Sequence, residues 1–174
     1  MAKPIVQSQF GHFACCHAAR WSACHKFTAY EIYGNTTANH LSKLLLLNNR
    51  LLRILQCKPI KTHTADLYNT YFTLPLQLLH SYQILVFMHR YVHYRNELPV
   101  IFSTYFEEKQ FIHHHDTRHK HDFHTHFVHT EFGKRSIKYK GCKLWNNLPV
   151  DIKAIRSNRS FKLELKQLLL QLLE

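Results

Sequence analysis

The chain has 174 residues, which is enough for one domain or two very small ones. Apolar residues make up 45% and charged residues 20%, close to the averages of globular proteins, and this argues against wholesale disorder. Only four glycines are present, too few for a glycine-rich phosphate loop or a dinucleotide crevice. Lysine and arginine outnumber the acids by 23 to 11, and the net charge of +12 predicts a polyanionic partner, most often nucleic acid.

The cysteines and the apolar runs bear on the compartment. The five cysteines form no repeating framework, and Cys15 and Cys16 are adjacent, so we expect reduced thiols in an intracellular protein. The longest leucine run, at 44–47, is far shorter than the roughly 18 residues typical of a membrane span. Histidine and arginine interrupt the apolar residues near the N-terminus. The sequence therefore predicts neither a secretory signal nor a membrane partner.

Residues 1–26 show no hydrophobic period and are predicted to be poorly structured. The first predicted helix covers residues 39–57 and ends before Pro59, which lacks an N–H group and disfavours helix before it. Its leucines recur near the helical period and give one broad apolar face. These residues are Leu41, Leu44, Leu45, Leu51, Leu52 and Leu55. We expect Asn48, Asn49, Arg50 and Arg53 to lie mostly on the other side.

Two helices are predicted next, a short one over 62–72 and a longer one over roughly 75–94, whose first turn suits Pro75. Apolar residues spread over a wide face of the longer helix, which indicates contact with more than one neighbour. Eight of the 17 residues in 113–129 are histidine, and this composition predicts an irregular, exposed loop.

The C-terminal part carries most of the charge. Between residues 134 and 166 there are ten lysines and arginines and two acids, which leaves a net charge of +8. Aromatic residues are interleaved with them: Phe132, Tyr139, Trp145 and Phe161. Basic side chains neutralise phosphates and aromatic faces stack on unpaired bases. The competing interpretation makes Trp145 and Phe161 core residues, which is compatible with phosphate binding by the charges.

A final helix is predicted from about 160 to 173, with one apolar face and with Lys162, Glu164, Lys166 and Gln167 largely opposite it. The fold class predicted from these elements is all-α, a small irregular helical bundle with a long His-rich loop. We expect Trp145 and Leu148 to join the terminal helix to the bundle.

The acidic residues argue against polymerase or nuclease chemistry. Two-metal catalysis needs clustered carboxylates, because each Mg²⁺ is held by hard oxygen ligands. The four aspartates are isolated, and the adjacent pair Glu107 and Glu108 is typical of a solvated surface. The sequence therefore predicts no catalytic residue, no cofactor and no small-molecule substrate.

The histidines leave a second interpretation open, because Zn²⁺ accepts neutral imidazole nitrogen. One set of spaced ligands consists of His119, His121, His124, His126 and His129. Another consists of Cys15, Cys16, His17, Cys24 and His25. Neither spacing matches a closed zinc site, so compositional bias is the favoured explanation and no metal site is assigned. With five cysteines and 16 histidines, some cysteine is expected to lie near a histidine by chance, so no Cys–His nucleophile pair is assigned.

Residues 130–149 read TEFGKRSIKYKGCKLWNNLP. This segment resembles a signature of non-LTR retrotransposon polyproteins, in the region after the reverse transcriptase core of jockey-like elements. The matching residues are Gly133, Lys134, Ser136, Ile137, Gly141, Leu144, Trp145, Asn146, Leu148 and Pro149. Departures are Cys142, where proline usually follows glycine, and the expanded histidine tract.

Other segments resemble the same family in the same order. The tetrapeptide at 115–118 is similar to its aromatic-Asn-Thr-Arg step, and 33–36 is similar to the Trp-Gly-Asn-Thr pattern of its thumb region, with Tyr33 in place of tryptophan. Residues 160–162 and the last helix fit its C-terminal end. The likeness covers about residues 27–174, and several ordered matches are more specific than one short motif.

The resemblance implies a narrow function. The parent polyprotein is an RNA-directed DNA polymerase, and this piece corresponds to the thumb and C-terminal extension, which grip nucleic acid. These 174 residues contain no Tyr-x-Asp-Asp motif, so the chain is expected to be no enzyme by itself. It is expected to bind RNA or DNA backbone weakly and with strong salt dependence, without sequence specificity. A His-rich metal-binding protein and a remnant without selected activity are the alternatives.

The expected organisation has four parts. They are a poorly structured segment at 1–26, a thumb-like helical region at 27–112, a His-rich loop at 113–133 and a basic extension with the terminal helix at 134–174. The residues expected to contact nucleic acid are Arg118, Lys134, Arg135, Lys138, Lys140 and Lys143.

Overall fold

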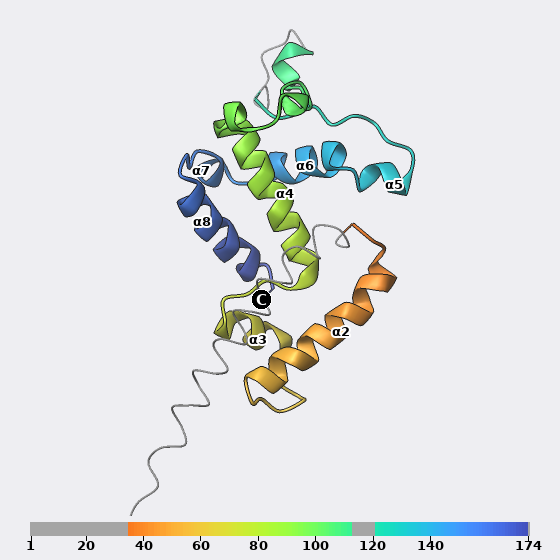
Figure 1. Ribbon diagram of the computed structural model, residues 1–174, viewed down its shortest axis with the longest axis vertical. Coiled ribbons are helices and arrows are strands. Elements are labelled where there is room, and N and C mark those ends of the chain that lie inside the picture. The colour runs from red at the N-terminus through yellow and green to blue at the C-terminus, as the bar shows by residue number, and fades with distance from the viewer. Residues whose placement is uncertain (1–34, 113–120, 174) are drawn as a thin grey trace, which may run out of the picture. The chain divides into compact units, whose positions relative to one another are not determined.

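The computed structural model describes residues 35–112 and 121–173 (Figure 1). Within these ranges the chain is mostly helical and has no strand, which confirms the all-α fold class. The one β-type pairing found there is an isolated antiparallel bridge between Glu108 and Phe123. The chain divides into two compact units, Met1–His80 with Leu173–Glu174, and Ser81–Leu172. The four expected segments with their boundaries remain predictions.

The helices follow the predicted order. The elements are α2 Ala38–Leu55, α3 Thr64–Thr70, α4 Leu76–His93, the 3-10 turns η1 Arg95–Glu97, η2 Val100–Phe102 and η3 Lys109–Phe111, then α5 Glu131–Lys134, α6 Ile137–Asn146, α7 Val150–Lys153 and α8 Asn158–Gln171. The helices predicted over 39–57, 75–94 and 160–173 are α2, α4 and α8 with ends shifted by a few residues. Of the His-rich loop predicted over 113–133 the structure describes 121–133, where 121–130 are free of helix and α5 begins at Glu131. The prediction that the loop is exposed is wrong at Phe123, which is buried in the aromatic cluster beside α4.

In the first unit α3 packs on α2 through Leu67 and Tyr68, which are both buried. The Tyr68 hydroxyl donates to the Asn49 side-chain oxygen at 2.5 Å and accepts from the Asn48 amide at 3.0 Å. The Gln56 amide donates to the Leu67 carbonyl at 2.8 Å. The prediction that Asn49 lies away from the packed face is wrong, because a buried tyrosine hydroxyl needs a polar partner and Asn49 supplies it.

Helix α2 ends in a Schellman motif. The Lys58 amide donates to the Arg53 carbonyl at 2.9 Å, and the Cys57 amide donates to the Ile54 carbonyl at 3.1 Å. Cys57 has φ 51°, the left-handed region that glycine adopts most readily. A side chain at this position costs conformational energy that the two hydrogen bonds offset.

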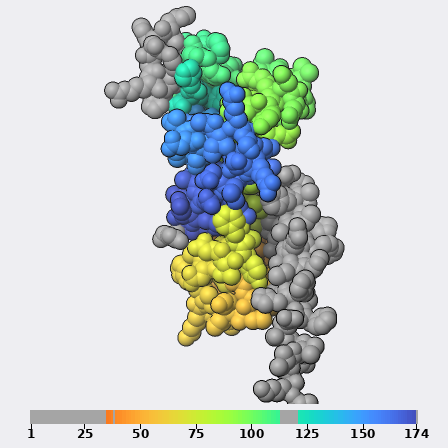
Figure 2. Space-filling view, turned by 90° about the vertical axis from the view of Figure 1, so that its left-hand side faces the viewer, coloured from red at the N-terminus to blue at the C-terminus, as the bar shows by residue number. Residues whose placement is uncertain are grey.

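In the second unit α4 is the central helix, with α6 and α8 packed against it (Figure 1). One end of α4 meets an aromatic cluster, where Tyr91 lies edge-on to Phe106 at 4.8 Å and near Phe123 at 5.9 Å between ring centroids. Helix α6 approaches at Gly141, where an added Cβ would lie 3.1 Å from the Met88 sulfur. The prediction that the helix over 75–94, which is α4, contacts more than one neighbour is therefore confirmed. In the view of Figure 2 the atoms of residues 121–172, coloured teal to dark blue, lie next to one another on the surface.

His89 lies fully buried between α4 and α8. Its ring stacks on Phe161 at 4.1 Å, and its Nε2 lies 2.7 Å from the Ile155 carbonyl oxygen. Because a carbonyl only accepts, Nε2 carries the proton and Nδ1 is the acceptor nitrogen, which is buried without a hydrogen-bond partner. Burial is the main cause that lowers the pKa of His89, and the neighbouring His93 and Lys162 lower it further, against the Ile155 hydrogen bond.

We predict that Cys57→Gly raises the free energy of unfolding by about 0.5–1 kcal/mol, because it relieves the left-handed strain while adding freedom to the unfolded chain. Urea unfolding followed by circular dichroism measures this change. Cys57→Ala keeps the Cβ and serves as the control, with stability close to the parent chain. A loss of stability in the glycine variant would contradict the Schellman assignment.

We predict that stability falls in acid because of His89. Its folded-state pKa lies below the unfolded value of about 6.5, so its contribution is complete above that pH and is lost as the pH falls through the folded pKa. Urea unfolding monitored by tryptophan fluorescence at several pH values should show a flatter profile for His89→Leu. The exposed His121→Gln is the control and should keep the parent profile. Equal profiles for the parent and His89→Leu would refute the prediction.

Candidate nucleic-acid interface

The segment that carries the basic residues begins with two capped helices. The Thr130 hydroxyl accepts from the Gly133 amide at 3.1 Å, and the Ser136 hydroxyl accepts from the Tyr139 amide at 3.3 Å. A Cβ at Gly133 would collide with Val128. The helices predicted from periodicity leave 134–149 unassigned, and the structure has α6 there. Ser136 caps α6, which is then stabilised by packing on α4.

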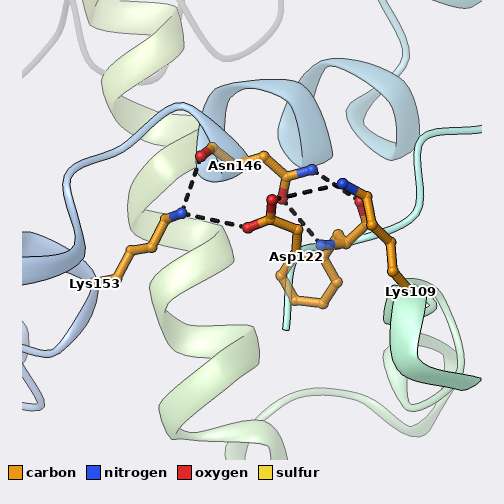
Figure 3. A network of polar contacts seen from close by, with 5 residues as sticks. Lys109, Asp122, Asn146 and Lys153 are labelled. Atoms are coloured by element: carbon orange, nitrogen blue, oxygen red, sulfur yellow. Dashed lines mark hydrogen bonds and ion pairs between the residues drawn. The ribbon is translucent and has the colours of Figure 1, made fainter. Parts of the chain in front are cut away.

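Asn146, at the end of α6, holds the chain that follows the His-rich tract. Its side-chain oxygen accepts from the Phe123 amide at 3.0 Å, and its side-chain nitrogen donates to the Phe123 carbonyl at 2.8 Å. Lys153 donates to the Asn146 backbone carbonyl at 3.0 Å. Figure 3 shows these contacts next to Asp122, whose carboxylate lies 3.5 Å from the Lys109 Nζ and 3.6 Å from the Lys153 Nζ.

Three further motif residues serve the fold. Trp145 and Leu148 are buried, and the Trp145 ring lies 6.1 Å from that of Phe161 on α8. Pro149 is the N-cap residue of α7. The structure thus confirms that Trp145 and Phe161 are core residues, and it excludes them as platforms for stacking bases.

Two of the predicted contact residues, Lys134 and Arg135, interact with Glu131. Lys134 Nζ lies 2.6 Å from the Glu131 carboxylate, and this hydrogen bond lowers the pKa of Glu131 and raises the pKa of Lys134. The Arg135 Nε donates to the Glu131 carbonyl at 3.2 Å. An exposed ion pair of this kind is weak, and phosphate can compete for the lysine.

The three predicted lysines of α6 do not share a face. Residues 138 and 140 lie roughly 200° apart around a helix that turns about 100° per residue. Lys138 and Lys140 are half-buried, and burial lowers the pKa of Lys140, whereas Lys143 is exposed. Among these three, Lys143 is the residue best placed for a phosphate in solvent. Arg118 lies outside the described residues.

Helix α8 carries a row of basic residues that are not among the predicted nucleic-acid contacts. Arg159, Lys162 and Lys166 are spaced i, i+3 and i+7, so they lie on one side of the helix. Arg159 and Lys162 are exposed, and Lys166 is half-buried with its pKa lowered by burial. The helical spacing of these three residues could have indicated the stripe from the sequence. The predicted helix already had Lys162 and Lys166 largely opposite its apolar face.

The stripe continues toward the start of α8. Arg156, just before the helix, is exposed, and its carbonyl accepts from the Tyr94 hydroxyl at 2.8 Å. The N-terminal end of a helix dipole adds positive potential beside it. Glu164, the one acid of α8, lies roughly 140° around the helix from Arg159. We name Arg156, Arg159, Lys162 and Lys166 the α8 basic stripe.

Two exposed aromatic rings lie near α5. Phe132 is 82% exposed and Phe127 is 83% exposed, and the Phe127 ring meets that of His129 edge-on at 4.6 Å. Tyr139 is half-buried. Of the interleaved aromatic residues in the basic segment, Phe132 is therefore the one open to stacking on a base.

The histidines do not assemble a metal centre in the described ranges. No three His, Cys, Asp or Glu side chains of residues 35–112 and 121–173 come close enough together to hold an ion. The rings of His124 and His126 lie 4.9 Å apart, edge to face. The cysteine-containing candidate at 15–25 and several histidines of the tract lie outside the described residues.

Cys142, on the buried side of α6, is a further candidate reactive group. Burial raises its pKa to about 11, with nearby Lys138 acting in the opposite direction. The thiol is therefore protonated near neutral pH, and this environment is that of a structural cysteine rather than a nucleophile.

Comparison with protein-family models, with curated proteins and with solved structures gave no match. The resemblance to retrotransposon polyproteins thus rests on the motifs quoted above. Over the part of the chain that the structure describes, no helix has both the length and the apolar character needed to cross a bilayer.

We predict that Asn146→Ala lowers the free energy of unfolding by about 1–3 kcal/mol, because it leaves the Phe123 amide and carbonyl without their partners. Asn147→Ala, at the exposed neighbouring position, should change stability by less than about 0.5 kcal/mol. Urea unfolding followed by tryptophan fluorescence compares the two. Equal effects would show that the Asn146 contacts contribute nothing.

Proposed function

We propose that this chain is a nucleic-acid-binding fragment of a retrotransposon reverse transcriptase polyprotein, and that it binds the phosphate backbone through the α8 basic stripe together with Lys143. The observation that carries the proposal is the exposure of Arg159 and Lys162 one turn apart on α8, with Arg156 exposed just before the helix. Basic side chains in solvent displace the condensed counterions of a nucleic acid, which favours binding without base recognition.

In this proposal the chain binds a nucleic-acid strand and does not add nucleotides to it. Its aspartates are isolated in the sequence, and polymerisation needs adjacent carboxylates to hold two magnesium ions. Lys134, which is paired with Glu131, and the half-buried Lys138 and Lys140 contribute less than the exposed Arg159 and Lys162, because an ion pair or partial burial opposes contact with a phosphate. The half-buried Lys166 contributes less for the same reason.

The ordered motifs support the family assignment, and the charge supports the binding. These two supports are independent, because the motif residues Gly141, Trp145 and Asn146 serve packing and hydrogen bonding. A chain that binds RNA without any retrotransposon ancestry would share the charge and lack the motif.

We predict that Arg159→Gln/Lys162→Gln weakens binding of a labelled single-stranded RNA and reduces the slope of log affinity against log salt by about 1.4, or by about 1.8 for duplex DNA. Fluorescence anisotropy between about 50 and 200 mM salt measures both. The control Lys58→Gln/Lys61→Gln removes the same charge from two exposed positions between α2 and α3.

Three outcomes decide the question. Loss confined to the α8 variant supports a local interface. Equal loss in both variants means that net charge alone attracts the nucleic acid, and the α8 assignment is then wrong. No binding by the parent chain at low salt would refute the proposed function altogether.

A further inference from the structure

Helix α2 has an apolar side that α3 does not cover. The predicted single broad face is split in the structure, because Leu41 and Leu52 are buried and other members of it are exposed. Leu47 is 64% exposed and Ile54 is 65% exposed, and both lie outside that predicted face. Leu44 and Leu51 are also exposed. We name these four exposed residues the α2 seam: Leu44, Leu47, Leu51 and Ile54.

The spacing of the α2 seam is that of a helix-pairing surface. Its members follow one another at intervals of three, four and three residues, which are the a and d positions of two heptads. The seam is narrow, because Lys43 and Arg50 border one edge and the part-buried Asn48, bonded to Tyr68, borders the other. A helix that lies in a membrane surface presents a wider apolar face, so a single partner helix fits this seam better.

Charge selects the partner. Lys43 and Arg50 are exposed at the two g positions beside the seam, and α2 contains no acidic residue. A helix that pairs with α2 gains favourable interactions if glutamate or aspartate lies at its flanking positions.

This chain cannot supply such a helix from its own basic segments. Residues 1–34 contain three lysines and arginines and one acid, and the segment from 134 to 166 carries a net charge of +8. A second copy in antiparallel pairing would set the g positions, Lys43 and Arg50, against the same basic residues. We infer that the α2 seam binds an acidic amphipathic helix of another protein, with leucine or isoleucine in its a and d positions.

The test uses the full chain and a labelled three-heptad peptide with leucine and isoleucine at a and d and glutamate at e and g. Two control peptides carry lysine at e and g, or the acidic composition in scrambled order. We expect the acidic amphipathic peptide to bind about tenfold or more tighter than either control in fluorescence anisotropy. Equal binding of the scrambled peptide would overturn the inference, since it would reflect charge alone.

Variants of exposed positions locate the site. Leu47→Gln/Ile54→Gln should weaken peptide binding about tenfold or more, because two apolar contacts are lost. Leu46→Gln is the matched control, since Leu46 is 70% exposed on another side of α2 and its loss should leave binding unchanged. Lys43→Glu/Arg50→Glu should reverse the preference toward the lysine peptide. Circular dichroism verifies that all variants keep their helix content.

Two further measurements separate the other occupants. Sedimentation that shows a dimer of the parent chain, lost in Leu47→Gln/Ile54→Gln, would assign the seam to a second copy and overturn the inference. Binding to vesicles of phosphatidylserine, lost in the same variant while the acidic peptide fails to bind, would assign it to a membrane surface and overturn it equally.

Discussion

The structure of residues 81–172 depends on the burial of α4 on more than one side. Helix α6 reaches it through Gly141, where an added Cβ would lie 3.1 Å from the Met88 sulfur, and α8 reaches it through Phe161 stacked on His89. Because α8 buries Phe161, Leu165 and Leu169, its Arg159 and Lys162 lie in solvent. The location of the α8 basic stripe is thus a consequence of how the helices pack, with no requirement for a nucleic acid to be present.

The motif that resembles retrotransposon polyproteins has a physical explanation in this fold. Gly133 allows α5 to approach Val128, Ser136 caps α6, and Trp145 fills the core. Asn146 fixes the backbone of Phe123, and Pro149 is the N-cap residue of α7. Such residues specify a local structure, so the motif bears on ancestry and fold while the charge pattern bears on ligand.

Periodicity in the sequence was sufficient to predict α2, α4 and α8, because each repeats apolar residues at helical spacing. It did not predict α6, whose formation depends on the Ser136 cap and on contact with Met88, a residue about 50 positions away. Nor did periodicity show which part of an apolar face is covered. The leucines of α2 look equivalent in the sequence, yet Leu41 and Leu52 are buried whereas the α2 seam is exposed. The hydrogen bond between Tyr68 and Asn49 lies on the buried side.

A net charge counted from the sequence overstates the number of basic side chains that are available to a ligand. In the most basic segment Lys153 lies beside Asp122, Lys134 is paired with Glu131, and burial lowers the pKa of Lys140 and of Lys166. If all ten basic residues of that segment contacted duplex phosphates, the salt slope would approach about −9, whereas three or four contacts give about −3 to −4. The size of the salt slope therefore reports the number of charges that the fold leaves available, and it distinguishes a defined interface from diffuse attraction to a basic protein.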